Sequence, residues 1–181
     1  VSEFGSLRPQ EYQVVKDLLE NDQKIIGYLT GVSAFNKLGL TTQISNTIQI
    51  GTNFNRKAMK RGKYNIRFLR QKNTISKYNT YLLQILDSIR FIKKIPDSDV
   101  TKSCIRIIAL IKNLTEGDQI VIAKFALKYG PGTRALTGAI LDQVSQKGTT
   151  NQLLESLNSA TFYNFNISDQ VLKNKLKWRI S

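Results

Sequence analysis

Histidine is absent from this chain of 181 residues, and cysteine, methionine and tryptophan each occur once. Without histidine, a Ser-His-Asp triad, a Cys-His pair and a His-ligated metal site are all excluded. The single cysteine, Cys104, excludes a disulfide within the chain and is typical of a protein of the reducing cytoplasm. We therefore predict a cytoplasmic protein that holds no metal and no other cofactor.

Long apolar runs and acidic clusters are missing as well. No stretch approaches the ~18 apolar residues of a membrane-spanning helix, and no secretory signal pattern opens the chain. Asp97 and Asp99 precede one expected helix, and Glu116 and Asp118 start the next, where helix capping accounts for them. We predict no membrane partner and no catalytic site. An enzyme, the alternative, would have to work with carboxylates, Lys, Tyr or Arg alone.

Positive charge dominates what is present. The chain has 27 Lys and Arg against 13 Asp and Glu, a net charge of +14. Nine basic residues and no acidic one fall between residues 56 and 77, and a weaker basic cluster near Trp178 ends the chain. Because 41% of the residues are hydrophobic, this is a chain with a core and not a disordered basic tail. The excess favours a polyanionic partner, nucleic acid above all.

Hydrophobic periodicity changes along the chain. A helix from Pro9 and a short helix at 33–38 are interleaved with β-prone runs at 24–28, 47–50 and 56–70. Helical spacing then predicts helices at about 82–92, 100–111, 116–129, 133–146, 152–157 and 169–176. This order predicts an α+β fold, with a small N-terminal mixed or antiparallel sheet with helices and an all-helical C-terminal half. We expect one domain over 7–181, preceded by a cloning scar at 1–6.

A basic hairpin is the strongest candidate for a binding site. Residues 56–60 and 64–70 are predicted to form two strands around a turn at Arg61-Gly62. One side of the second strand would carry Tyr64, Ile66 and Phe68, and the other side Asn65, Arg67 and Leu69. Cations lined up on one face above an apolar face suit contacts to phosphates. We predict that nucleic acid or another polyanion binds Arg56, Lys57, Lys60, Arg61, Lys63, Arg67, Arg70 and Lys72.

Two plainer interpretations of the hairpin stay open. Its charges could form an ordinary solvated face, or protect an edge strand against aggregation. A Gly130-Pro131-Gly132 segment ahead of a helix poses a similar choice, because free N–H groups at a helix N-terminus favour anions. The P-loop spacing is absent, and a turn with Thr133 as N-cap is the simpler interpretation. Gly138 is expected to allow close helix packing, and Trp178 to anchor the C-terminus or else to stack on a ligand.

Residues 31–43, GVSAFNKLGLTTQ, resemble a signature of the AbiEi-like antitoxins of type IV toxin–antitoxin systems. The matching positions are Gly31, Asn36, Gly39, Leu40, Thr42 and Gln43. A strand at 47–51 and the basic hairpin follow in the order found in that family. The segment GPGTRALTGA at 130–139 is similar to a second segment of the family, with Arg134 and Gly138 at matching positions. Residues 164–180 resemble the C-terminus of the family. The resemblance runs in order over most of residues 7–180.

This resemblance implies an antitoxin domain of a phage-defence (abortive infection) system that opposes a nucleotidyltransferase toxin, either directly or by shielding the toxin's target. In the family, a winged helix-turn-helix precedes the domain and regulates transcription of the operon. Nothing ahead of Leu7 matches it, so operator readout is not carried over. The alternative is a nucleic-acid-binding accessory domain of a transcriptional regulator. Residues 31–51 are also similar to nucleotidyltransferase folds, but the strand TIQIGT lacks the Asp-x-Asp that holds catalytic metal.

Overall fold

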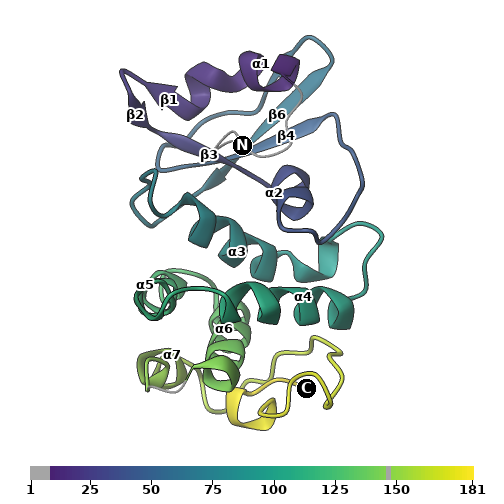
Figure 1. Ribbon diagram of the computed structural model, residues 1–181, viewed down its shortest axis with the longest axis vertical. Coiled ribbons are helices and arrows are strands. Elements are labelled where there is room, and N and C mark those ends of the chain that lie inside the picture. Colours follow the sequence, from purple (N-terminus) through teal and green to yellow (C-terminus); the bar gives the residue numbers. More distant parts are fainter. Residues whose placement is uncertain (1–8, 146–147) are drawn as a thin grey trace. The chain divides into compact units, whose positions relative to one another are not determined.

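The computed structural model describes residues 9–145 and 148–181 (Figure 1). The chain divides into two compact units, Val1–Asp87 and Ser88–Ser181. Both sheets lie in the first unit, and the second unit is mainly helical, so the predicted α+β fold is confirmed. The single domain over 7–181 stays a prediction. The expected scar at 1–6 lies outside the described residues.

The first unit holds a small mixed sheet. Its elements are α1 (Pro9–Leu19), β1 (Glu20–Asn21), β2 (Lys24–Ile25), β3 (Gly27–Thr30), α2 (Val32–Lys37), β4 (Thr47–Thr52), β5 (Met59–Arg61), β6 (Tyr64–Arg70) and α3 (Thr80–Arg90), whose last turn enters the second unit. β1 and β2 form an antiparallel pair, and the other four strands form a sheet in the order β3-β4-β6-β5. β4 and β6 run parallel, whereas the β3–β4 and β5–β6 pairs are antiparallel.

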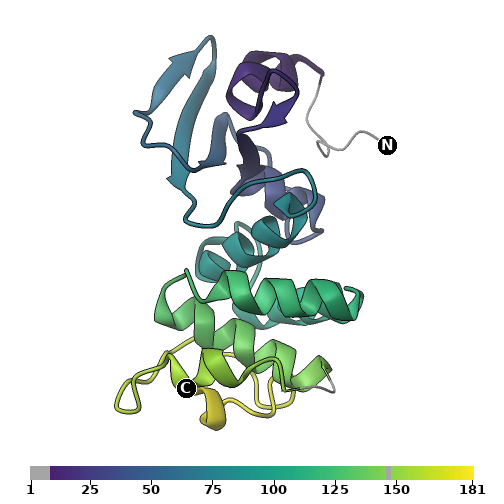
Figure 2. The ribbon, with the colours of Figure 1, turned by 90° about the vertical axis from the view of Figure 1, so that its left-hand side faces the viewer.

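One face of the four-stranded sheet is buried under α1, the purple helix beside the blue strands in Figure 2. The apolar cluster between them consists of Val15, Leu18, Leu19, Leu29, Ile48, Ile50, Tyr64 and Ile66. The predicted alternation of β6 is confirmed, since Tyr64 and Ile66 are buried while Asn65 and Arg67 are exposed. A period of two therefore fixes which hairpin side chains can reach solvent on the face away from α1.

A buried polar network holds β3 against the first part of α3. Asp87 is fully buried, and its Oδ2 accepts hydrogen bonds from the hydroxyls of Tyr28 (2.7 Å) and Thr30 (2.8 Å). The side-chain amide of Gln84 donates to the Leu29 carbonyl (2.9 Å). A buried carboxylate costs several kcal/mol unless hydrogen bonds replace its water, and the two hydroxyls supply them. The network thus joins strand and helix in one specific arrangement.

The second unit is organised around α6. Its elements are η1 (Ile92–Lys94), α4 (Val100–Lys112), α5 (Glu116–Ala126), α6 (Pro131–Val144), α7 (Asn151–Glu155) and η2 (Leu176–Trp178). α6 contacts α4, α5, α7 and η2. Trp178 is fully buried, and a Cβ placed at Gly138 would lie 2.0 Å from its ring. The packing role predicted for Gly138 and the anchoring role predicted for Trp178 are confirmed.

Three local predictions are wrong. The hairpin turn is Gly62-Lys63, because Arg61 pairs with Tyr64, and residues 56–58 lie outside the strand. α6 begins at Pro131, with Gly130 as N-cap and no side-chain cap, because the fixed φ of proline suits the first helical position. Residues 169–175 form turns and not a helix.

Among the described residues, no helix has both the length and the apolar composition to span a membrane.

Candidate functional site

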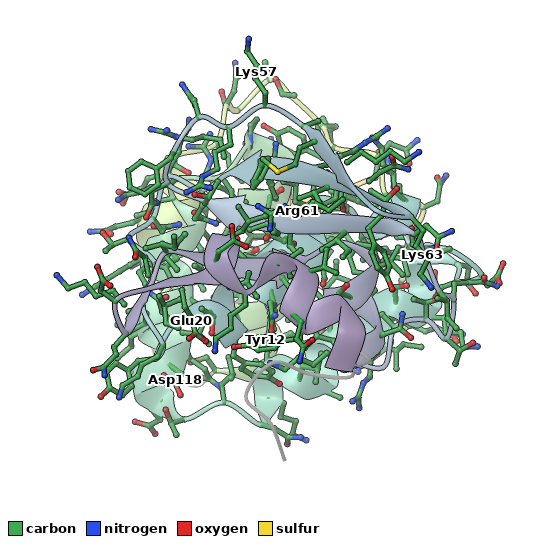
Figure 3. The ribbon with its side chains drawn as sticks, turned by 90° about the horizontal axis from the view of Figure 1, so that it is seen from above. Tyr12, Glu20, Lys57, Arg61, Lys63 and Asp118 are labelled. Atoms are coloured by element: carbon green, nitrogen blue, oxygen red, sulfur yellow. The ribbon has the colours of Figure 1, made fainter. Side chains whose placement is uncertain are left out.

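The eight basic residues predicted to bind polyanions lie on and beside the β5–β6 hairpin, whose strand β5 is an edge of the sheet. All are exposed except the half-buried Arg61. Figure 3 shows Lys57 and Lys63 pointing away from the molecule in different directions, with Arg61 between them above α1. The hairpin thus spreads its positive charge along the sheet edge.

Strand register divides these charges between the two faces of the sheet. Lys60 pairs with Asn65 and so lies on the face of Arg67, away from α1. Arg61 pairs with Tyr64, whose side chain is buried under α1, so Arg61 lies on the α1 face. The prediction of a single charged face is therefore wrong. The turn falls one residue later than expected, so Arg61 is the last residue of β5 and not part of the turn. As the strand neighbour of Lys60, Arg61 points to the other face of the sheet.

Lys57, Lys60, Lys63 and Arg67 form what we call the open cationic surface. Within the described part of the chain, none of the four makes an ion pair or a side-chain hydrogen bond, although Lys63 lies 5.2 Å from the ring centroid of Tyr64. No acidic residue occurs between residues 56 and 77 to compete for them. Their donors are therefore available to phosphate oxygens.

Arg61 instead binds the hairpin to α1. Its Nη1 donates to Asp17 Oδ1 (2.6 Å) and to the Val14 carbonyl (2.6 Å), and its Nη2 donates to Asp17 Oδ2 (2.9 Å). Hydrogen bonding by Arg61 holds the pKa of Asp17 below its ordinary value, and the carboxylate raises the pKa of Arg61. Most donors of this guanidinium are in use, so we place Arg61 among the residues that position the hairpin.

The remaining three predicted residues lie at the margin of this surface. The guanidinium of Arg56 lies 5.8 Å from the ring centroid of Phe68, and Arg70 Nη1 donates to Asn55 Oδ1 (3.3 Å). Lys72 follows β6 and is exposed. These three add to the local positive potential, but Arg56 and Arg70 are also held by contacts within the protein.

The residues of the 31–43 motif shape the turn around α2. Gly31 has a φ of 63°, and a Cβ there would lie 1.8 Å from the side-chain oxygen of Gln49. The Asn36 amide donates to the carbonyls of Val32 (3.0 Å) and Gln43 (2.6 Å), which closes the loop after the helix. The other motif positions are Gly39 at positive φ, the buried Leu40 and the exposed Thr42 and Gln43. In the later motif, Arg134 is half-buried and Gly138 receives Trp178.

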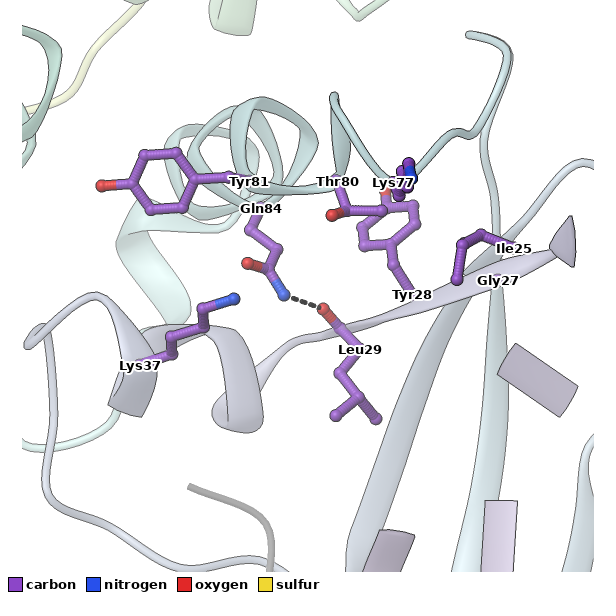
Figure 4. A pocket seen from close by; sticks show the side chains of 9 residues that line it. All are labelled: Ile25, Gly27, Tyr28, Leu29, Lys37, Lys77, Thr80, Tyr81 and Gln84. Carbon is purple, nitrogen blue, oxygen red and sulfur yellow. Dashed lines mark hydrogen bonds between the residues drawn. The ribbon is translucent and has the colours of Figure 1, made fainter. Parts of the chain in front are cut away.

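A pocket in the first unit was missed by sequence reasoning (Figure 4). Its lining residues are Ile25, Gly27, Tyr28, Leu29, Lys37, Lys77, Thr80, Tyr81 and Gln84. Lys37 lies in the recognised motif and Lys77 ends the basic run, so both cations were visible in the sequence. No sequence signal placed them around one cavity, because they come from different elements.

Neither the single thiol nor the acidic side chains of the described residues form a reactive or metal-binding group. Burial raises the pKa of the Cys104 thiol to about 12, so this thiol is neutral and unreactive at neutral pH. In 9–145 and 148–181, no group of three or more Cys, Asp or Glu side chains is arranged to hold a metal ion.

Comparison with known proteins gives one match. The model of a family described as "Family of unknown function (DUF6088)" matches residues 2–123. This range includes the whole four-stranded sheet and its hairpin and ends within α5. No curated protein and no solved structure matches the chain.

Proposed function

The chain belongs to DUF6088, a family of unknown function, and we propose that it is a non-catalytic module that binds nucleic acid through the open cationic surface. In the role that the resemblance to AbiEi-like antitoxins implies, this binding opposes a nucleotidyltransferase toxin. A nucleic-acid-binding accessory domain of a transcriptional regulator, without antitoxin activity, is the second candidate.

One observation carries the proposal: four exposed cations on and beside an edge hairpin have no anionic partner in the described protein. Cations that neutralise phosphates release condensed counterions, which supplies affinity without sequence readout. Lys60 and Arg67 lie on one face and Lys63 on the adjoining turn, so the three can follow a phosphate backbone along the sheet edge.

Between the two possible modes of neutralisation, shielding the toxin's target fits this surface better than contact with the toxin. Shielding requires only positive groups in register with phosphates, and phosphate contacts carry no sequence information. A specific contact with a protein would call for an apolar centre with a polar rim. The open cationic surface consists of three lysines and one arginine, which suits RNA or DNA.

Fluorescence anisotropy with a labelled single-stranded RNA and a labelled DNA duplex tests binding. The variant Lys60→Gln/Lys63→Gln/Arg67→Gln should lower the slope of log affinity against log salt by about 2 to 3, since each lost phosphate contact removes ~0.7 to 0.9. A matched control, Lys102→Gln/Lys112→Gln/Lys124→Gln, removes the same charge from exposed positions in the second unit. Equal losses in both variants would show that net charge, and not this surface, accounts for binding.

Co-expression separates the two candidate roles. The antitoxin role predicts that a nucleotidyltransferase is encoded beside this chain. The full chain should rescue growth of cells that express this enzyme, and the hairpin variant should abolish rescue while the control variant retains it. Nucleic-acid binding without rescue by the natural chain would favour the accessory domain. Full rescue by the hairpin variant would show that the antitoxin does not act through the open cationic surface.

A further inference from the structure

Another pocket lies within the second unit, at the N-terminal end of α6. The end of α3 with η1 forms one side of it, the first residues of α6 form another, and Phe165 comes from the C-terminal segment. Its volume is about 290 Å³. Pockets for drug-sized ligands span about 300–1,000 Å³, so this one suits a small group.

Three cations surround this pocket. Arg90 is the last residue of α3, and Lys93 and Lys94 belong to η1. All three are exposed, and they form no ion pair and no side-chain hydrogen bond with residues 9–145 and 148–181. None of the described residues that line the pocket is acidic. The lining therefore creates a positive potential that it does not itself neutralise.

The start of α6 adds backbone donors to these charges. Pro131 has no N–H group, and the N-cap residue Gly130 has no side chain to cap the helix. The N–H groups of Gly132 and Thr133 therefore have no hydrogen-bond partner within the described chain. Because α6 has 14 residues, these groups carry the positive end of a full helix dipole, where anions bind.

The side chain of Thr133 is a second, independent sign of a ligand. Since Gly130 takes the N-cap position predicted for Thr133, the hydroxyl has no helix end to cap, and it forms no hydrogen bond with any described residue. Thr133 is only 8% exposed, yet its oxygen is not sealed inside the protein, so it opens into the pocket that the residue lines. The hydroxyl is thus available to donate to an oxygen of an anion.

The two aromatic rings of the pocket hold cations and not a ligand. The guanidinium of Arg90 lies 5.1 Å from the ring centroid of Phe91, and Lys93 Nζ lies 5.3 Å from that of Phe165. Such contacts restrain the charged groups and leave their hydrogen-bond donors unused. Both rings are half-buried and have a cation over them, so they offer no open wall for a base. The pocket therefore favours the anionic group alone.

We infer that this pocket binds a phosphate dianion, either inorganic phosphate or the terminal phosphate of a phosphomonoester. Its oxygens accept hydrogen bonds from the N–H groups of Gly132 and Thr133 and from the Thr133 hydroxyl. The three cations neutralise its charge of about −1.5 to −2 at pH 7, which exceeds the single charge of a carboxylate or a phosphodiester. The site is independent of the proposed function, since the hairpin belongs to the other unit.

Isothermal titration calorimetry on the full chain at fixed ionic strength tests the inference with inorganic phosphate, glycerol 3-phosphate and dimethyl phosphate. At least one of the first two should bind saturably at a single site, and the diester dimethyl phosphate should bind at least about tenfold more weakly. Tighter binding of glycerol 3-phosphate would identify a phosphomonoester as the ligand. Tighter binding of inorganic phosphate would identify the free anion.

Two charge variants locate the site. Arg90→Gln/Lys93→Gln/Lys94→Gln should lower the affinity for the dianion at least about tenfold. The matched control, Lys102→Gln/Lys112→Gln/Lys124→Gln, removes the same charge from exposed positions of the second unit outside this pocket and should change the affinity less than about twofold. The hairpin variant should retain full affinity, which separates failure here from failure of the proposed function.

A second pair of variants leaves the charge unchanged. Thr133→Val removes the hydroxyl but keeps the branched side chain, and it should lower the affinity at least about threefold. Its matched control is Thr137→Val, one turn further along α6. The Thr137 hydroxyl is fully buried, has no hydrogen-bond partner in the described protein and lies outside the pocket, so its loss should leave the affinity unchanged.

Several outcomes would overturn the assignment. They are the absence of saturable binding by either dianion up to about 10 mM, unchanged affinity in the Arg90/Lys93/Lys94 variant, an equal loss in its control, and dimethyl phosphate that binds as tightly as the dianions. If circular dichroism shows that the charge variant does not fold, Thr133→Val decides in its place, and natural affinity in that variant would then overturn the assignment.

Discussion

The basic hairpin and the basic C-terminal segment look alike in the sequence, but the structure uses their charges differently. In the C-terminal segment, Lys175 forms an ion pair with Asp169, and Lys177 lies 2.7 Å from Asp142. Asp142 Oδ2 also accepts from the buried Trp178 ring nitrogen (3.3 Å), so these charges help to hold the end of the chain on α6. On and beside the hairpin, the four cations of the open cationic surface have no such partner among the described residues.

The amount of charge does not explain this difference. The first unit has 13 Lys and Arg against 6 Asp and Glu, and the second has 14 against 7, so each unit carries a net charge of +7. What differs is whether a carboxylate is within reach of the cations. Clustered charge therefore indicates a binding surface only where the fold leaves the cations without partners.

The largest expected effect tests the structural role of the C-terminal segment. Replacing Trp178 by Ala should lower the free energy of unfolding by about 3 to 5 kcal/mol, because the ring fills the space against Gly138 and is fully buried. Urea denaturation followed by circular dichroism measures it. The control Phe162→Ala, at a ring that is 54% exposed, should cost far less. A loss below about 1 kcal/mol for Trp178→Ala would mean that the segment is not an anchor.

Nucleic-acid affinity compares the two basic segments directly. At low salt, Lys60→Gln/Lys63→Gln/Arg67→Gln should weaken binding at least about tenfold, whereas Lys173→Gln/Lys175→Gln/Lys177→Gln should weaken it by less than about threefold. The reason is that two of the three C-terminal lysines already have carboxylate partners. Anisotropy titrations measure both variants. The reverse order would place the binding surface at the C-terminus.

Two arginines of the hairpin should separate into a structural and a binding residue. Arg61→Gln should lower the free energy of unfolding by about 0.5 to 1 kcal/mol, since its pair with Asp17 is partly exposed and screened by water. Arg67→Gln should change stability by less than about 0.5 kcal/mol but should reduce nucleic-acid affinity. Urea melts and anisotropy on the two single variants provide the comparison. Equal stability losses would contradict the assignment of Arg61 to the hairpin–α1 contact.

The smallest expected effect is a change in how the free energy of unfolding depends on pH in acid. Hydrogen bonds from Arg61 lower the pKa of Asp17. At Asp142, burial raises the pKa, but hydrogen bonds from Lys177, Trp178 and Asn174 outweigh burial, so the pKa of Asp142 is lowered as well. A carboxyl with a lowered folded pKa contributes stability above its unfolded pKa of about 4 and loses it as the pH falls further. Unfolding free energies from pH 6 to 2 should therefore decline less steeply in Asp17→Asn and in Asp142→Asn. Unchanged slopes would contradict both pairings.

Periodicity predicted much of this fold because it is a local property. The alternation of residues 64–68 and the helical spacing after residue 80 depend only on which face each side chain occupies. The partners of the hairpin cations depend on register: a turn one residue later sends Arg61 to Asp17, 44 positions away in sequence. The pocket was not predictable, because Lys37 and Lys77 line one cavity only when α2, β3 and the segment before α3 are assembled.

The order β3-β4-β6-β5 has a consequence for how the first unit assembles. Paired residues of β5 and β6 are 3 to 7 positions apart, whereas every pair between β4 and β6 is separated by 18 positions. Short loops close at a lower entropic cost, so the hairpin can form first and then enter the sheet beside β4 as a preformed unit. Its loop begins at Gly62, which has a φ of 56° that other residues rarely adopt. We therefore expect a substitution at Gly62, in the most positively charged part of the chain, to slow formation of this hairpin.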